Sequence, residues 1–293
     1  MAIQILLNGL SLGAAYALVA VGFCLVFSIL KFTNFAHGAM ISAAAYIGYV
    51  CAVKFDLGLY GTLAAAVIGG ALVGVIGEFI AFRTITKKSS SVFYFFVSSL
   101  TLGTLIEQII TIRIGSELIT YPSFFDQASI QFADGKYSIS MVNVYMLVSA
   151  CIALGLLFFF LNKTKYGRAI RATSFDRDTT YLMGVDTFRC IQIVFLLAGA
   201  VAGLGSVFLG MTYTISAQLG SRVVVKGFIS SVVGGLGSVE GAVLGGILLG
   251  IVETLLIFFL GSGWAPVATF VILLAFLLLR PEGLLGVIVQ EKA

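Results

Sequence analysis

The sequence predicts an all-α membrane protein, a polytopic helix bundle of about eight or nine passes with broken helices and an internal repeat. Hydrophobic residues make up 60% of its 293 residues and charged residues only 10%, whereas soluble domains carry roughly 25% charged residues. The apolar runs, such as 141–161, are continuous and reach the about 20 residues that a membrane-spanning helix requires. They lack the alternation of a membrane β-barrel. One transmembrane domain over residues 1–293 is therefore expected.

Candidate spans are placed where the apolar runs begin and end. They are 3–30, 35–53, 58–81, 92–112, 141–161, 189–212, 223–234, 241–260 and 265–279. Glycines within them recur at a spacing of four, which lets helix backbones approach closely in lipid. These pairs are Gly9 and Gly13, Gly70 and Gly74, Gly199 and Gly203, Gly241 and Gly245, and Gly246 and Gly250. We therefore expect a tightly packed bundle.

Basic residues in short loops predict the orientation of the bundle, because such loops stay in the cytoplasm. Arg83, Lys87 and Lys88 mark one basic loop, and Lys163–Arg189 marks another. Two candidate spans separate these loops, so both are expected on the cytoplasmic side. The same alternation of spans places the N-terminus outside and the tail 280–293 inside.

The loop 113–140 is then external, and it is the only sizeable extramembrane element expected on that side. Alternating side chains at 129–132 and 137–139 flank the turn-like sequence of residues 133–135. This pattern predicts a small external hairpin.

The segment Lys163–Arg189 concentrates charge, with six of the 17 Lys and Arg residues and three of the 13 Asp and Glu residues. Two short helices are expected, around Tyr166–Thr173 and Asp176–Met183, with Asp176 as an N-cap and Gly184 just beyond the C-terminus. Their surface fits either a groove on a partner protein or lipid head groups. The contacting residues would be Arg168, Ala169, Arg171, Ala172, Asp176, Arg177, Tyr181, Leu182, Met183 and Gly184.

Two regions interrupt the apolar pattern, Lys31–Gly38 and Val233–Gly241, and a small-residue helix is expected after each. This similarity indicates a weak internal duplication, and broken helices at matching positions mark the translocation path in many transporters. The alternative is that both regions are short cytoplasmic turns. The path candidates here are Asn34, Phe35, His37, Gly38, Gly234, Gly235, Gly237 and Ser238.

Titratable residues within the spans are further path candidates. Glu107 and Glu253 lie inside candidate spans, and intramembrane acidic residues usually face the interior of the bundle. Each fits an interhelical hydrogen bond as well as a substrate contact. His37, the only histidine, fits either a proton relay or ligand, or a helix-end side chain that bonds a backbone carbonyl.

Other classes of function lack their sequence signals. The four cysteines form no CxxC pair, so neither a metal site nor a disulfide framework is expected. The net charge of +4 is modest and segregated, which concerns orientation rather than nucleic acid. No GK[ST] sequence is present, since Gly135-Lys136 is followed by Tyr137. Any ATP chemistry must therefore come from a partner, and no catalytic residues are assigned.

Four stretches together carry a resemblance to a known family. They are NGLSLGAAYALVAVG…NFAHGAM, TKYGRAIRATSFDRDTTYLMGVDTFR, KGFISSVVGGLGSVEGAVLGGILLGIVETL and LRPEGLLG. In this order and spacing the chain resembles the permease subunits of branched-chain amino-acid (leucine/isoleucine/valine) ABC transporters over nearly its whole length. The urea-type permeases of the same group share much of the pattern, so a urea or amide importer stays an alternative.

The resemblance implies partners that composition does not reveal. They are a second permease subunit, two cytoplasmic ATPase subunits that use ATP, and an extracytoplasmic solute-binding protein, in a bacterial or archaeal plasma membrane. This chain would bind no cofactor and would act by alternating access, with the family's coupling segment at Tyr166–Gly184. The remaining alternatives are an ion-coupled secondary carrier acting alone and a membrane scaffold without transport.

Overall fold

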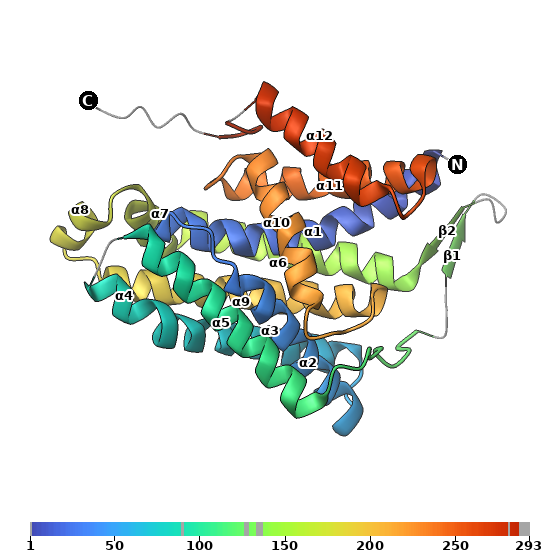
Figure 1. Cartoon of the computed structure of the whole chain (residues 1–293), viewed down its shortest axis with the longest axis horizontal. Helices are drawn as coiled ribbons and strands as arrows, with labels where there is room; N and C mark the ends of the chain where they lie inside the picture. The colour runs from blue at the N-terminus through green and yellow to red at the C-terminus, as the bar shows by residue number, and fades with distance from the viewer. Residues whose placement is uncertain (1, 89–90, 126–128, 133–136, 281, 287–293) are drawn as a thin grey trace.

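The chain forms a helical bundle with one two-stranded hairpin, seen here in a computed structural model that describes residues 2–88, 91–125, 129–132, 137–280 and 282–286 (Figure 1). The elements in chain order are α1 (Ala2–Leu30), α2 (Ala36–Lys54), α3 (Leu59–Gly77), the π-helical η1 (Glu78–Phe82), α4 (Arg83–Lys88), α5 (Val92–Ile114), β1 (Ser129–Phe132), β2 (Tyr137–Ser140), α6 (Met141–Lys163), α7 (Lys165–Phe175), α8 (Arg177–Leu182), α9 (Thr187–Thr212), α10 (Leu219–Gly234), α11 (Val239–Leu260) and α12 (Ala265–Leu279). This architecture confirms the predicted all-α membrane fold.

Within the described residues, seven helices are long and apolar enough to cross a membrane, and α12 is a shorter apolar helix. The predicted count of eight or nine passes is therefore not confirmed. The difference lies in the candidate spans 223–234 and 265–279, which fall in α10 and α12. At 1.5 Å per residue the 16 residues of α10 and the 15 residues of α12 reach about 22–24 Å, less than the about 30 Å of a bilayer core.

The two ends of the bundle carry the elements that charge predicted for them (Figure 1). At one end, side chains of α4 and α8 line a common pocket, which includes Lys87 and Arg177. Both predicted basic loops therefore lie at the same end. At the other end, Gln4 of α1 bonds the backbone of Ser138 in β2 through both of its amide atoms (2.6 and 3.0 Å). The N-terminus therefore lies beside the hairpin.

The external hairpin is confirmed, with β1 and β2 antiparallel and Ser129 paired with Ser140. The expected turn at 133–135 lies outside the described residues. The loop before it is held down by Tyr121, whose buried hydroxyl donates to the Ala45 carbonyl of α2 (2.7 Å). A backbone bridge between Ile119 and Ile215 ties this loop to the connection between α9 and α10.

The centre of the bundle is α1, which packs against α6, α9, α10 and α11. Most of α1 beyond its first two turns is buried, as expected for a helix that is apolar on every side. The helices α1 and α9 pack together, and the shorter helices α2 and α10 pack against α9 and α1, respectively.

The predicted glycine pairs make the closest helix contacts. A Cβ atom on Gly70 or Gly74 of α3 would collide with backbone atoms of α9, where Gly199 and Gly203 make the matching approach. The same holds between α1 and α11, through Gly9, Gly13, Gly246 and Gly250. Because glycine has no side chain, glycines at this spacing let the two helix backbones touch directly. Each row of glycines, or glycine stripe, therefore joins one pair of helices.

Candidate functional site

The helix pair α7–α8 forms a polar cap on the end of the bundle that also carries α4 (Figure 1). Its bounds, Lys165–Phe175 and Arg177–Leu182, confirm the two helices predicted here. Asp176 caps α8 as expected, because its carboxylate accepts from the amides of Asp178 and Thr179 (both 3.0 Å). Gly184 follows the helix with φ +85°, a conformation that glycine adopts without strain.

Apolar side chains of α7 and α8 project into solvent. Phe175 is 94% exposed, Leu182 83% and Met183 80%, and Tyr181 is also exposed. Such a cluster of large exposed apolar groups marks an interaction surface. We call Phe175, Tyr181, Leu182 and Met183 the apolar knobs. Phe175 was not among the predicted contacts, although it precedes the predicted N-cap directly.

The other predicted contacts on this segment differ in what they touch. Arg171 donates to the Leu161 carbonyl (2.8 Å) and to the Asn162 side chain (2.5 Å) at the end of α6. It therefore joins α7 to α6, and it is also exposed at the surface. Arg168 and Ala172 are exposed, and Ala169 is half-buried.

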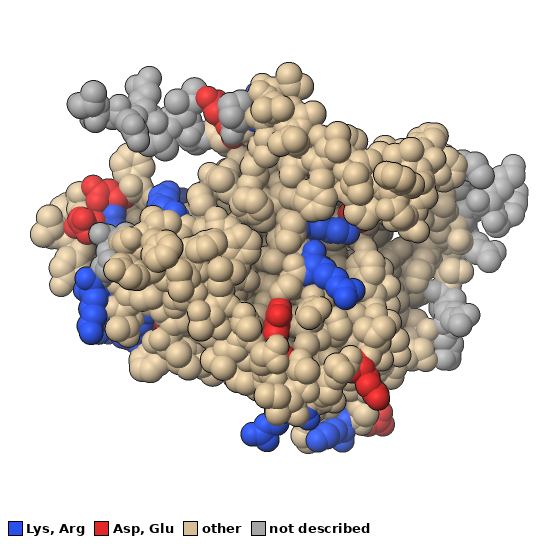
Figure 2. Space-filling view, in the orientation of Figure 1, with Lys and Arg blue, Asp and Glu red and all other residues tan. Residues whose placement is uncertain are grey.

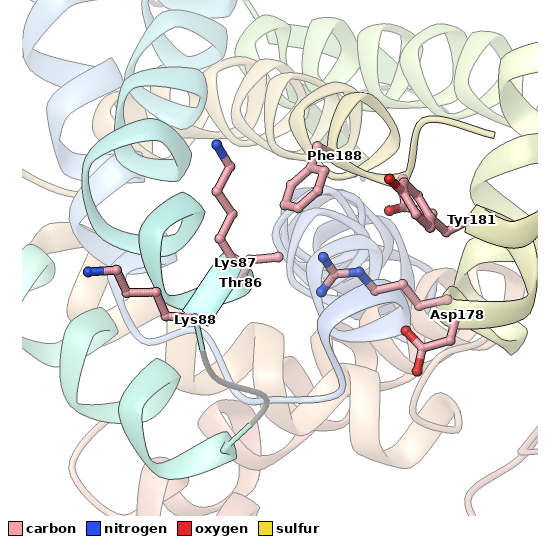
Figure 3. A pocket seen from close by; sticks show the side chains of 8 residues that line it. Thr86, Lys87, Lys88, Asp178, Tyr181 and Phe188 are labelled. Carbon is pink, nitrogen blue, oxygen red and sulfur yellow. The ribbon is translucent and has the colours of Figure 1, made fainter. Parts of the chain in front are cut away.

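The pocket between α4 and α8 has a volume of about 360 Å³ (Figure 3). Lys87, Lys88 and Arg177 give it a positive wall. The guanidinium of Arg177 and the ammonium of Lys87 both lie over the Phe188 ring, 5.2 and 5.7 Å from its centroid. These cation–π contacts link the start of α9 to both short helices.

The first interrupted region places a helix start inside the bundle. Lys31 ends α1 in a left-handed conformation (φ 54°), and Asn34 then accepts from the Ala36 amide (3.1 Å). His37 is fully buried beside Gly22 of α1. Neither of its ring nitrogens makes a hydrogen bond of normal geometry, although the Val19 carbonyl lies near. The expected bond to a carbonyl is thus not confirmed for His37.

The beginning of α10 meets this region. The Gly220 amide donates to the Ser42 hydroxyl of α2 (2.8 Å), and Gly38 packs against the backbone of Gly220. One residue further, the Ser221 hydroxyl bonds the carboxylate of Glu107 on α5. The structure therefore brings Gly38 and Glu107, both predicted for the path, to the same end of α10.

The second interrupted region lies at the other end of α10, in the turn that leads to α11. Gly235 and Gly237 have φ of 110° and 90°, and Ser238 caps α11 by accepting from the Gly241 amide (3.0 Å). Gly237 and Ser238 share a small cavity with Arg171 of α7. This region is therefore separated from Asn34–Gly38 by the length of α10, and its part in the path stays a prediction.

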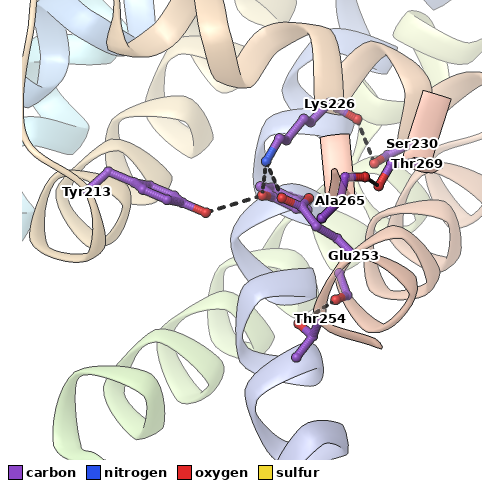
Figure 4. A network of polar contacts seen from close by, with 9 residues as sticks. Tyr213, Lys226, Ser230, Glu253, Thr254, Ala265 and Thr269 are labelled. Atoms are coloured by element: carbon purple, nitrogen blue, oxygen red, sulfur yellow. Dashed lines mark hydrogen bonds and ion pairs between the residues drawn. The ribbon is translucent and has the colours of Figure 1, made fainter. Parts of the chain in front are cut away.

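A buried polar cluster joins α1, α10 and α11 (Figure 4). The ammonium of Lys226 contacts Oε1 of Glu253 (2.5 Å) and donates to the Tyr16 hydroxyl (2.7 Å). The hydroxyls of Tyr16 and Tyr213 lie 3.4 Å apart. Glu253 is 5% exposed and shares its buried face with the predicted glycines of α11. Both predicted glutamates thus make the interhelical bonds that the sequence allowed.

Sequence reasoning missed Lys226, Tyr16 and Ser221. Lys226 carried a usable signal, because a lysine within a candidate span requires a buried partner or a polar cavity. Tyr16 and Ser221 carry no such signal, since their roles depend on helices distant in sequence. In the described residues no group of three or more His, Cys, Asp or Glu side chains is placed to hold a metal ion.

Comparisons with known proteins give consistent matches. The sequence profile of a family described as "Branched-chain amino acid transport system / permease component" matches residues 5–280. The chain is 29% identical to the high-affinity branched-chain amino acid transport system permease protein LivH of Salmonella typhimurium, over 97% of this chain and 95% of that protein. It is also 29% identical to the corresponding protein BraD of Pseudomonas aeruginosa, with the same coverage.

Solved structures share the fold. PsaBC from Streptococcus pneumoniae, solved in complex with Fab, superposes with a TM-score of 0.53 at 16% identity, covering 93% of this chain and 89% of that chain. An inward-facing putative metal-chelate type ABC transporter gives a TM-score of 0.52 at 16% identity, covering 94% and 84%.

Proposed function

The chain belongs to the family of branched-chain amino acid transport permeases, and we propose that it forms one membrane subunit of an ATP-driven importer for leucine, isoleucine and valine. It is a multi-pass plasma-membrane protein and a transport subunit rather than an enzyme. In the proposed importer a second permease completes the path, and a solute-binding protein delivers the amino acid from outside. Two cytoplasmic ATPase subunits use the ATP, and this chain binds no cofactor.

The observation that carries this proposal is the set of apolar knobs on α7 and α8. They project beyond the bundle at the end that carries the basic α4. Short helices with exposed apolar side chains fit a groove on a folded partner. An ATPase subunit is the partner that the family membership supports.

Contacts within the chain would carry movement from α7–α8 into the bundle. Arg171 ties α7 to the last turn of α6, and the Thr164 hydroxyl caps the first turn of α7 by accepting from Gly167 (3.0 Å). α8 leads directly into α9, which packs against α1, α2 and α3. A push on the apolar knobs would therefore tilt α6 and α9 together, which is the coupling that alternating access needs.

The test substitutes the apolar knobs while sparing the packed residues. Met183→Asp and Leu182→Asp should abolish co-purification of the co-expressed ATPase subunits, and with it ATP-driven leucine uptake. Arg171→Glu is a poor probe, because it would also break the α6–α7 junction. The matched control is Leu118→Asp, since Leu118 is equally a large exposed apolar side chain but lies in the external loop. Retained co-purification in Met183→Asp, at the control's level, would refute the docking role.

A further inference from the structure

A cavity of about 580 Å³ opens between α10, α11, α12 and the connection that precedes α10. Its size falls in the range of about 300–1,000 Å³ that is typical of small-molecule sites. Most of its wall is apolar and consists of Leu219, Val223, Val225, Ile229, Pro266 and Phe270. The surface over α10 also carries basic side chains in the middle of an otherwise nearly uncharged bundle (Figure 2). An apolar pocket with a few charged groups is what a small amphiphilic ligand requires.

The charged groups of this cavity are Arg222, Lys226 and Glu253. Arg222 lies one helical turn before Lys226, so both face the cavity from α10. In the described part of the chain Arg222 makes neither an ion pair nor a side-chain hydrogen bond. Lys226, in contrast, is already engaged by Glu253 and Tyr16.

The carboxylate of Glu253 is only half satisfied. Its Oε1 atom contacts Lys226, but its Oε2 atom has no hydrogen-bond partner among the described residues and is buried. A buried carboxylate oxygen without a donor is costly. Within the described chain, the cavity is therefore lined by an unpaired guanidinium on α10 and by a glutamate on α11 that has one buried oxygen without a donor. Figure 4 shows this glutamate beside Lys226.

We propose that this cavity binds the zwitterionic head group of an aliphatic α-amino acid. The ligand carboxylate binds Arg222, and the ligand ammonium binds Oε2 of Glu253 after a rotation of the glutamate side chain brings this buried oxygen to the cavity surface. This assignment rests on the proposed function, because the import of branched-chain amino acids requires such a ligand to pass through the chain. The aliphatic side chain then lies against the apolar wall formed by Val223, Ile229 and Phe270.

The chemistry favours a zwitterion over other small solutes. A guanidinium binds a carboxylate through two parallel hydrogen bonds, and such charge-assisted bonds are the strong ones. A carboxylate ligand without an ammonium would leave Oε2 of Glu253 unsatisfied. A neutral ligand such as urea would meet neither charge with an opposite one. Only a ligand that carries both charges close together can pair with both groups, and α-amino acids have an ammonium and a carboxylate on the same carbon.

Lys226 acts as a positioning residue in this site. Its ammonium holds Oε1 of Glu253 and thereby leaves Oε2 for the ligand. The Tyr16 hydroxyl in turn fixes the lysine from α1. Because Lys226 and Arg222 share α10, whereas Glu253 lies on α11, the ligand would bridge two helices. A movement of α10 relative to α11 would then weaken both ionic contacts at once and release the ligand.

The test follows ligand binding without transport. Thr214, which lines the cavity and is exposed, is replaced by cysteine in a Cys151→Ser background, since Cys151 is an exposed native thiol. The full chain is placed in lipid nanodiscs, and its alkylation by N-ethylmaleimide is followed by mass spectrometry. L-Leucine should slow the alkylation of Thr214→Cys. Leucinamide lacks the carboxylate and 4-methylpentanoate lacks the ammonium, so neither should. A Ser123→Cys reporter in the external loop is the control and should be unaffected.

Substitutions test the two assigned contacts separately. Arg222→Gln should raise the leucine concentration that gives half-protection by about tenfold or more, as expected for the loss of one charge-assisted contact. Glu253→Gln should do the same, and Arg222→Lys should fall between. Protection that is equal for leucine and both analogues, or that is unchanged in Arg222→Gln, would overturn the proposal. The analogue series uses the intact cavity, so it remains decisive if Glu253→Gln does not fold.

Uptake measurements separate this inference from the proposed function. If the assembled importer takes up leucine but leucine does not protect Thr214→Cys, the cavity assignment is wrong and the proposed function stands. If leucine protects the cavity but the importer carries no leucine, the proposed function fails and the binding site stands. The Met183→Asp variant should lose uptake and keep protection.

Discussion

The ion pair between Lys226 and Glu253 makes a sharp energetic prediction. The glutamate side chain is 6% exposed and that of the lysine 28%, so Lys226→Met leaves a nearly buried carboxylate without its cation. Breaking one side of such a pair costs about 3–5 kcal/mol of unfolding free energy. Glu253→Gln should cost less, because the lysine keeps Tyr16 at 2.7 Å and its ammonium can turn toward the cavity.

The double variant Lys226→Met/Glu253→Gln separates the pair from its environment. Replacing both members of a buried pair is often nearly neutral, so the double variant should be more stable than Lys226→Met alone. The assay is reversible unfolding of the purified chain by SDS titration in mixed micelles. Single-variant losses that simply add in the double variant, to within about 0.5 kcal/mol, would refute the claim that the two charges are coupled.

Three further predictions concern packing, capping and the external loop. Gly199→Leu should abolish the monodisperse size-exclusion peak, because the added side chain meets the backbone of α3. Gly155→Leu is the control and should keep the peak, because Gly155 has open space around it. Equal elution profiles for the two variants would contradict the packing account. The Thr179 hydroxyl and the backbone amides of α8 lower the pKa of Asp176, so its cap stabilises α8 above the unfolded pKa of about 3.9 and is lost as pH falls through the lower folded value. Asp176→Ala should therefore reduce amide hydrogen-exchange protection in 177–182 at pH 7, and an unchanged protection would sink the prediction. Tyr121→Phe should lower the free energy of unfolding by about 0.5–1.5 kcal/mol, because one hydrogen bond is lost. It should also speed proteolysis of the external loop, and an unchanged cleavage rate would disprove this prediction.

The helix pair α7–α8 was predictable because the residues that begin and end its helices act on near neighbours in the sequence. Asp176 bonds amides two and three residues ahead, and Gly184 ends a helix only two residues before it. Such hydrogen bonds depend on neighbours in the sequence. The bonds of Arg171 to α6 were not predicted, because their acceptors lie nine and ten residues away in the sequence. The spacing of residues within α7 does not predict contacts with another helix.

The two interrupted regions show where similar sequence leads to different environments. Both contain glycine or polar residues that stop a helix, and the sequence treats them alike. In the structure, Asn34 begins a helix inside the bundle, whereas Gly235 and Gly237 form a turn at its end beside α7. The depth of a helix start depends on which helices surround it, and that is set by packing over the whole chain.

The sequence by itself determined the helical membrane fold, the ends to which its charges belong, the caps of the short helices and the spacing of the glycine stripes. Each of these follows from composition or from contacts within about one helical turn. Only the tertiary structure decided that the stripe of Gly70 meets that of Gly199, and that Lys226 finds Glu253 and Tyr16, which is 210 residues distant. The physical reason is that spacing within a helix fixes which face is small or polar, whereas the partner of that face is selected by packing among all the helices.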